Sequence, residues 1–195
     1  EQKLPLLLHL MKNNSELTTI IFTSQKSMIE RIVRALGRAK FEAKGISSDN
    51  SQEDREEYLR GFKNKQFKIL VATDVLSRGI DINNLNLVIN FDVPRDAEDY
   101  IHRIGRTARA ETTGTALTFI NEKDQYRIAN IEKLLEREVE KQNITESLGL
   151  GKAPEYKASS APRKPFRKPD GGGKKKFFNK KKSPFPTNNV AKNGN

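Results

Sequence analysis

The segment Lys68–Thr73, which reads KILVAT, is a continuous run of apolar and β-branched residues. A run this short and this apolar is typical of a strand that is buried on both faces of a parallel sheet. Residues 17–22 and 87–91 have a similar composition, and the more mixed segments 41–46 and 114–120 are also expected to be strands. The sequence therefore predicts five strands, at 17–22, 41–46, 68–73, 87–91 and 114–120.

Between these runs, apolar residues recur at helical spacing. The expected helices cover 3–13, a segment after Ser24 that ends near Gly37, a segment after Ser51 that includes Phe62, a segment opened by Asp96, and 122 to about 141. Ser24 and Ser51 are the expected N-caps. In the last helix, four residues are expected to point inward: Ile128, Ile131, Leu134 and Leu135. Alternating strands and helices indicate an α/β domain with a mainly parallel sheet flanked by helices.

Two polar loops follow predicted strands. Residues 73–81, which read TDVLSRGID, come after the third strand, and residues 92–95, which read DVPR, come after the fourth. In a parallel sheet, ligands bind where the carboxyl ends of the strands meet. These two loops are therefore the expected place for a functional site.

The second loop leads into Tyr100–Arg109, which reads YIHRIGRTAR. Arg103, Arg106 and Arg109 recur at three-residue spacing, which would place them on one face of a helix. Planar guanidiniums held in this way suit phosphate oxygens. The alternative interpretation is an ordinary solvated basic helix face.

The positive charge of the chain is confined to its last part. Residues 1–150 hold 23 Lys and Arg against 23 Asp and Glu, whereas residues 151–195 hold 13 against 2, which accounts for the net charge of +11. We expect a folded domain over residues 1–148 and a disordered tail rich in Lys, Pro and Gly over residues 149–195. Phenylalanines interleaved with lysines suggest that the tail binds RNA, and a solubilising tail is the alternative.

Other function classes find little support in the sequence. The chain has no cysteine and only His9 and His102, which argues against a disulfide scaffold and a thiolate or histidine metal centre. No apolar run approaches the roughly 18 residues of a membrane span, and the first residues do not form a convincing signal peptide. We expect no membrane partner and a cytoplasmic location.

Four short motifs follow one another along the chain: TIIFTSQ at 19–25, SQEDR at 51–55, ATDVLSRGIDI at 72–82 and HRIGRTAR at 102–109. Together, and in this order, they resemble the second, C-terminal RecA-like domain of a DEAD-box RNA helicase, in a bacterial RhlE-like subgroup. The resemblance covers residues 1–145 and implies a RecA-like sheet. It also implies ATP hydrolysis coupled to RNA binding.

The resemblance also assigns roles to individual residues. Arg106 and Arg109 fall on arginine-finger positions that reach the ATP γ-phosphate and are the expected catalytic residues, while Asp81 falls on the position that contacts the ATP ribose. His102 and Arg103 fall on positions that couple the two domains. Five residues fall on positions that touch the RNA backbone: Gln52, Arg55, Thr73, Arg78 and Gly79.

The sequence also departs from the family pattern. Ser47-Ser48 stands where the family often has His-Gly, and Ala108 replaces a glycine. There is no G-x-x-x-x-G-K-[ST] and no Asp-Glu-Ala-Asp run. The resemblance therefore implies half of an active site, with ATP and Mg²⁺ held mainly by a missing N-terminal RecA-like domain, and we expect the chain alone to be inactive. The alternatives are a stand-alone RNA-binding module or RNA chaperone, and a DNA helicase of the same superfamily.

Overall fold

The computed structural model describes residues 2–73, 82, 85–107, 114–143, 145–153 and 155–157. The chain divides into two compact units, Glu1–Ala161 and Pro162–Asn195, and every described residue belongs to the first. The disordered tail predicted from the sequence lies for the most part outside the described residues. That part of the prediction stays a prediction.

The first unit is built on a five-stranded sheet whose strand order is β2-β3-β1-β4-β5. All four strand pairings are parallel, which confirms the predicted sheet. The strands are β1 (Thr19–Phe22), β2 (Ala43–Ile46), β3 (Ile69–Ala72), β4 (Leu87–Asn90) and β5 (Thr115–Thr118), each within a predicted segment. β1 lies in the centre, paired with β3 on one side and with β4 on the other.

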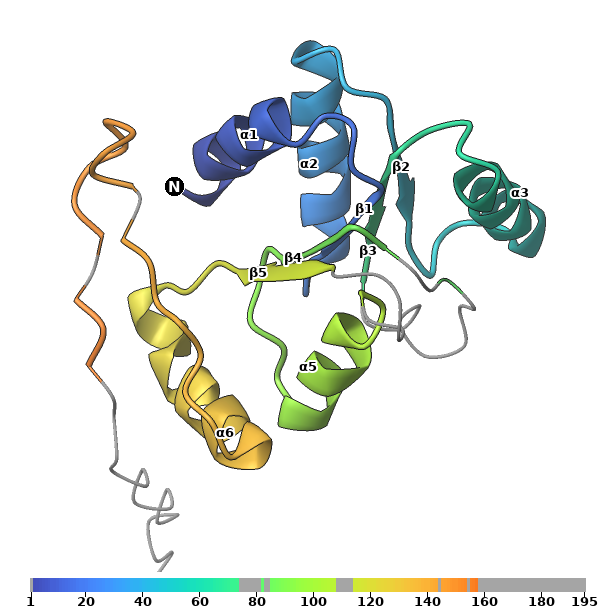
Figure 1. The fold of residues 1–195 in the computed structure, drawn as a ribbon. Helices are drawn as coiled ribbons and strands as arrows, with labels where there is room; N and C mark the ends of the chain where they lie inside the picture. The colour runs from blue at the N-terminus through green and yellow to red at the C-terminus, as the bar shows by residue number, and fades with distance from the viewer. Residues whose placement is uncertain are drawn as a thin grey trace, which may run out of the picture. The chain divides into compact units, whose positions relative to one another are not determined.

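Side chains alternate between the two faces of the sheet, because successive residues of a strand point to opposite sides. On one face, Ile21 and its neighbours pack against α1 (Lys3–Asn13) and α2 (Lys26–Arg38). On the other face, Ile20 and Phe22 pack against α3 (Gln52–Lys63). Helices α5 (Ala97–Ile104) and α6 (Gln125–Leu135) enclose a third apolar cluster between them. In Figure 1, α1 lies beside α2 and α5 lies beside α6.

The helix termini confirm one predicted cap and correct another. Ser51 caps α3, since its hydroxyl accepts a hydrogen bond from the Asp54 amide at 3.0 Å. Ser24 was expected to cap α2, but this prediction is wrong: the N-cap is Gln25, and the Ser24 amide donates to a carboxylate on another loop.

The last helix is shorter than predicted. A 3-10 turn, η1 (Glu122–Asp124), precedes α6, and α6 ends where Glu136 adopts a left-handed φ of 52°. Leu134 was expected to point inward, but 45% of it is exposed. The expected inward face assumed a longer helix, and the chain instead turns away at Glu136, two residues after Leu134.

The chain after α6 packs back onto that helix. Glu132 accepts hydrogen bonds from the side chains of Lys141 and Tyr156. The Gln125 amide group bonds the backbone of residues 155 and 157, at 2.8 and 3.0 Å. The packed chain therefore extends past residue 148, where the composition changes. Within the described part of the chain no helix has the length and apolar character that crossing a membrane requires.

The packing next to β5 can be tested by comparing substitutions at two glycines, Gly114 and Gly37. A Cβ on Gly114 would lie 2.5 Å from the Thr107 carbonyl oxygen and 2.6 Å from that of Leu85, whereas a Cβ on Gly37 would meet nothing within 4 Å. We expect Gly114→Ala to lower the free energy of unfolding by about 1–3 kcal/mol, as overpacking does. Gly37→Ala is the matched control and should leave stability equal or slightly higher. Urea unfolding of both variants checks this, and equal stabilities would contradict the close approach at Gly114.

Candidate functional site

The loops that follow the parallel strands meet at one edge of the sheet, which we call the carboxyl edge. Thr23 follows β1, Thr73 follows β3 and Asp92 lies two residues after β4. The strand order reverses between β1 and β4, because the chain fills one side of β1 before it crosses to the other. Such a reversal is where ligands usually bind in open parallel sheets.

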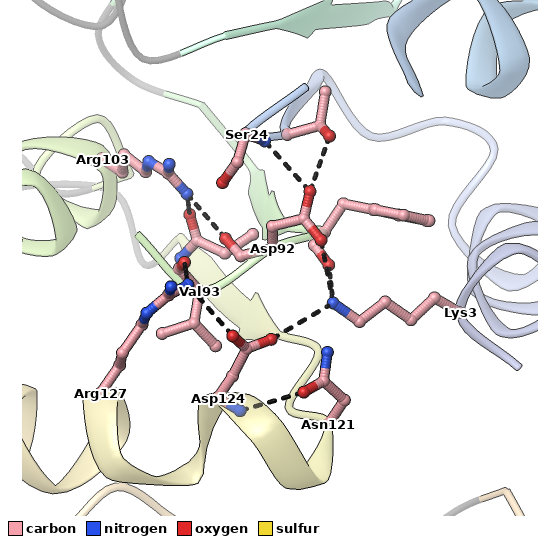
Figure 2. Close-up of polar contacts among 11 residues, drawn as sticks. Lys3, Ser24, Asp92, Val93, Arg103, Asn121, Asp124 and Arg127 are labelled. Atoms are coloured by element: carbon pink, nitrogen blue, oxygen red, sulfur yellow. Dashed lines mark hydrogen bonds and ion pairs between the residues drawn. The ribbon is translucent and has the colours of Figure 1, made fainter. Parts of the chain in front are cut away.

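At this position the carboxylate of Asp92 is the centre of a network of hydrogen bonds within the protein. One carboxylate oxygen accepts from the Thr23 hydroxyl at 2.8 Å and from the Ser24 amide at 3.0 Å. The other oxygen accepts from the Lys3 ammonium at 3.0 Å, and that ammonium also donates to the Phe91 carbonyl at 2.8 Å. Figure 2 shows Asp92 between Ser24 and Lys3. The crevice between β1 and β4 therefore holds an internal ion pair.

The network keeps Asp92 ionised. Burial alone would raise the pKa of this carboxyl, but the Lys3 ammonium, the Ser24 amide and the Thr23 hydroxyl outweigh that effect and lower the pKa below its ordinary value. The carboxylate lies just before the first turn of α2, where a helix N-terminus favours an anion. An external phosphate is therefore not needed at this helix start.

Lys3 also joins the network to the far side of the sheet. Its ammonium lies 3.9 Å from a carboxylate oxygen of Asp124, in the turn before α6. Asp124 in turn accepts from Arg127 at 3.1 Å, and Arg127 donates to the Val93 carbonyl at 3.3 Å. Helix α1, the loop after β4 and the start of α6 are thus held together at this edge (Figure 2).

Arg103, in the last turn of α5, is fully buried. Its guanidinium donates to the Asn90 side-chain oxygen at 2.9 Å and to the Asp92 carbonyl at 3.0 Å, and it lies 5.1 Å from the centre of the Phe22 ring. Asn90 completes the chain of bonds by donating to the Thr118 hydroxyl at 3.1 Å. Arg103 therefore fixes the end of α5 to the ends of β4 and β5, and any coupling to another domain through it acts by way of the position of α5.

The prediction that Arg103 and Arg106 lie on one helix face is wrong. Helix α5 ends at Ile104, so Arg106 lies in the turn that follows it, and Arg103 points into the fold. The backbone of Arg106 is held at both ends: its amide donates to the Arg103 carbonyl at 3.2 Å, and its carbonyl accepts from the Leu85 amide at 3.1 Å. Arg106 is half-buried in the turn directly after α5, and His102 is exposed in the last turn of the helix.

Three of the predicted RNA-binding residues are described by the structure: Gln52 and Arg55 in α3, and Thr73 directly after β3. Gln52 is exposed in the first turn of α3 and bonds Glu56 at 2.7 Å. Arg55 donates from one terminal nitrogen to the Ser48 carbonyl at 2.9 Å, while its buried Nε has no hydrogen-bond partner among the described residues. Thr73 is buried directly after β3. Asp81, Arg78, Gly79 and Arg109 lie outside the described residues, so their predicted roles stay predictions.

The model of the family described as "Helicase conserved C-terminal domain" matches residues 2–111. The chain belongs to this family. The helicase domain is 43% identical over 134 residues to the ATP-dependent rRNA helicase RRP3 of Encephalitozoon cuniculi. These 134 residues are 69% of this chain and 34% of the relative.

Two solved structures of DEAD-box proteins share its fold. The protein from Methanococcus jannaschii is 39% identical with a TM-score of 0.68, over 72% of this chain and 39% of that one. Escherichia coli SrmB, bound to regulator of ribonuclease activity A, is 31% identical with a TM-score of 0.70, over 82% of this chain and 91% of that one. The RecA-like fold is thereby confirmed, in a helicase C-terminal domain of the DEAD-box type. The chain spans 34% and 26% of the length of two curated relatives.

Sequence reasoning missed part of this site. Lys3 lies 89 positions from Asp92 and had no local signal. Asp92 itself opened one of the two polar loops, but its role as an internal anion did not follow from that. Within the described residues of this helicase domain, no group of three or more His, Cys, Asp or Glu could hold a metal ion.

Asp92→Asn tests the internal ion pair. The change removes the charge that balances Lys3 and should lower the free energy of unfolding at neutral pH by about 1–3 kcal/mol. A lowered pKa stabilises the fold above the pKa of the unfolded state, and this contribution is lost as the pH falls through the folded-state value. The difference between parent and variant should therefore be constant near neutrality and shrink below about pH 4.

The matched control for this comparison is Asp49→Asn. Asp49 pairs with Lys26 at 2.5 Å, but both side chains are more than half exposed, so this change should have little effect. Urea unfolding at several pH values measures both variants. A difference between Asp92→Asn and the parent that persists unchanged into acid would contradict the assignment of the effect to the carboxylate charge.

Proposed function

We propose that this chain is the C-terminal half of an ATP-dependent DEAD-box RNA helicase, and that it supplies arginine fingers and RNA-backbone contacts to an active site completed by an N-terminal RecA-like domain. The observation that carries the proposal is the anchored end of α5. A buried Arg103 ties that end to Asn90 and Asp92 at the carboxyl edge, where Gln52 and Arg55 also lie. The backbone of Arg106, in the turn that follows α5, bonds Leu85 just before β4.

The proposed contribution of this domain to catalysis is electrostatic stabilisation of the transition state. Bound ATP with Mg²⁺ supplies the phosphoryl group and lies mainly on the N-terminal domain. The guanidiniums of Arg106 and Arg109 would meet the negative charge that grows on the phosphate oxygens during transfer. Because the turn at Arg106 is held by backbone bonds, little reorganisation is needed when the two domains close.

RNA is the proposed substrate, held through its backbone without reading of bases. The proposed contacts lie at the carboxyl edge: Gln52 and Arg55 in the first turns of α3, and Thr73 directly after β3. Arg78 and Gly79 are proposed to join them. The basic segment after Ala161 supports a second, sequence-tolerant RNA contact. The same segment is the reason to propose the RhlE-like subgroup. A cytoplasmic location remains a proposal from the sequence.

Arg106→Ala and Arg109→Ala test the arginine fingers in the two-domain enzyme. Each should lower kcat with a modest change in KM, because the lost interaction forms in the transition state. We expect the low end of the range of about 10³–10⁵ known for arginine fingers in other enzymes, since two arginines share the task. Arg106→Lys should not restore turnover, because an ammonium cannot replace the fork.

Thermal midpoints decide between a functional and a structural role for these arginines. Steady-state ATP turnover with saturating RNA and the thermal midpoint are measured on the same preparations. We expect midpoints within a few degrees of the parent. Normal turnover, or a loss of turnover that a collapsed midpoint explains, would reject the assignment.

Removing the basic segment tests its share of RNA binding. The cut belongs after Ala161, because residues up to 157 pack onto α6. If about half of the basic residues beyond 150 meet phosphates, they should contribute about −4 to the slope of log K against log salt on single strands, and the truncated chain should show a flatter slope. An unchanged slope would contradict this proposal. Strong RNA annealing by the full chain without ATP would favour the alternative, an RNA chaperone.

A further inference from the structure

The outer face of α2 carries an unusual line of charge. Ser27, Arg31, Arg34 and Arg38 follow each other at spacings of four, three and four residues, so they form one straight line on the helix. The line lies opposite the buried residues Ile29, Ile32 and Leu36, and all four of its members are exposed. We call Arg31, Arg34 and Arg38 the arginine row.

Little in the described fold neutralises the arginine row. Helices α1 and α2, which cover this face of the sheet, contain six Lys and Arg and a single acid, Glu30. Glu30 pairs with Arg34 at 2.9 Å, whereas the side chains of Arg31 and Arg38 make no hydrogen bond or ion pair within the part of the chain that the structure describes. Since residues 1–150 are neutral overall, this concentration of charge is local.

Gly37 adds a second observation on the same helix. A glycine inside a helix costs about 0.5–1 kcal/mol relative to alanine, so a packing reason is usually expected for it. None is visible here: a Cβ on Gly37 would meet nothing within 4 Å. The residue is exposed one turn beyond Arg34, and its bare backbone allows close approach from outside.

The helix that carries the arginine row begins beside the proposed RNA-backbone contacts. The first residue of α2, Lys26, bonds Asp49 at 2.5 Å, in the loop whose Ser48 carbonyl accepts from Arg55 at 2.9 Å. From Ser27 to Arg38 the helix rises about 16 Å away from the carboxyl edge. A strand that leaves Arg55 in this direction would meet arginines about one helical turn apart.

We propose that the arginine row binds the phosphates of the RNA segment that flanks the one held at the carboxyl edge. This rests on the proposed function, since it extends the same bound strand. RNA fits better than an acidic protein because the row is continuous with a backbone-binding loop and because guanidinium forks pair bidentately with phosphate. The row lengthens the bound RNA without reading its sequence.

The test compares two triple variants of the full chain. Arg31→Gln, Arg34→Gln and Arg38→Gln remove the row and keep good helix formers. Lys133→Gln, Arg137→Gln and Lys152→Gln remove the same charge from exposed positions elsewhere. Both variants are titrated with single-stranded RNAs of about 6 and about 20 nucleotides over a range of salt concentrations. Thermal midpoints confirm that both are folded.

For the long RNA, removal of the row should lower the magnitude of the salt slope by about 2, as three lost phosphate contacts predict, and should weaken binding. For the short RNA, the row variant and the control should bind alike. Equal salt slopes of the two variants on the long RNA would overturn the proposal. An acidic protein would then be the better candidate for the partner of the arginine row. Failure of the parent chain to bind either RNA would instead overturn the proposed function and this inference with it.

Discussion

The arrangement of the carboxyl edge depends on one buried cation. Taking a guanidinium out of water is costly unless its donors are satisfied, and Arg103 finds the Asn90 side-chain oxygen, the Asp92 carbonyl and the face of Phe22. These partners come from two neighbouring strands, β1 and β4, and from the loop after β4. One side chain thereby sets where α5 ends and where the following turn, with Arg106, begins.

Asp92 links this cation to the rest of the domain. Its carbonyl accepts from Arg103, while its carboxylate accepts from Thr23, Ser24 and Lys3. The place between β1 and β4 where parallel sheets usually bind a ligand is thus occupied by the protein itself. The groups proposed to meet external phosphates, Arg106, Arg55 and the arginine row, are therefore residues outside this ion pair.

The sequence predicted what local patterns control. Apolar, β-branched runs located β1, β3 and β4, and the more mixed segments 41–46 and 114–120 located β2 and β5. A serine followed three residues later by an acid located the start of α3. It did not predict contacts between distant residues. Three-residue spacing placed Arg103, Arg106 and Arg109 on one helix face, but acceptors on β4 and its loop turn Arg103 inward, and the helix ends before Arg106. The pairing of Lys3 with Asp92 joins positions 89 apart, and no local pattern reports it.

Amide hydrogen exchange of an Arg103→Met variant tests the central claim most directly, because methionine keeps much of the length of the side chain and removes its donors. If Arg103 anchors α5, amides of Ala97–Ile104 and of the turn through Thr107 should exchange at least about tenfold faster, while the amides of β1 and β3 keep their protection. Unchanged protection in α5, or an equal loss over the whole sheet, would contradict the claim that this guanidinium positions the end of α5.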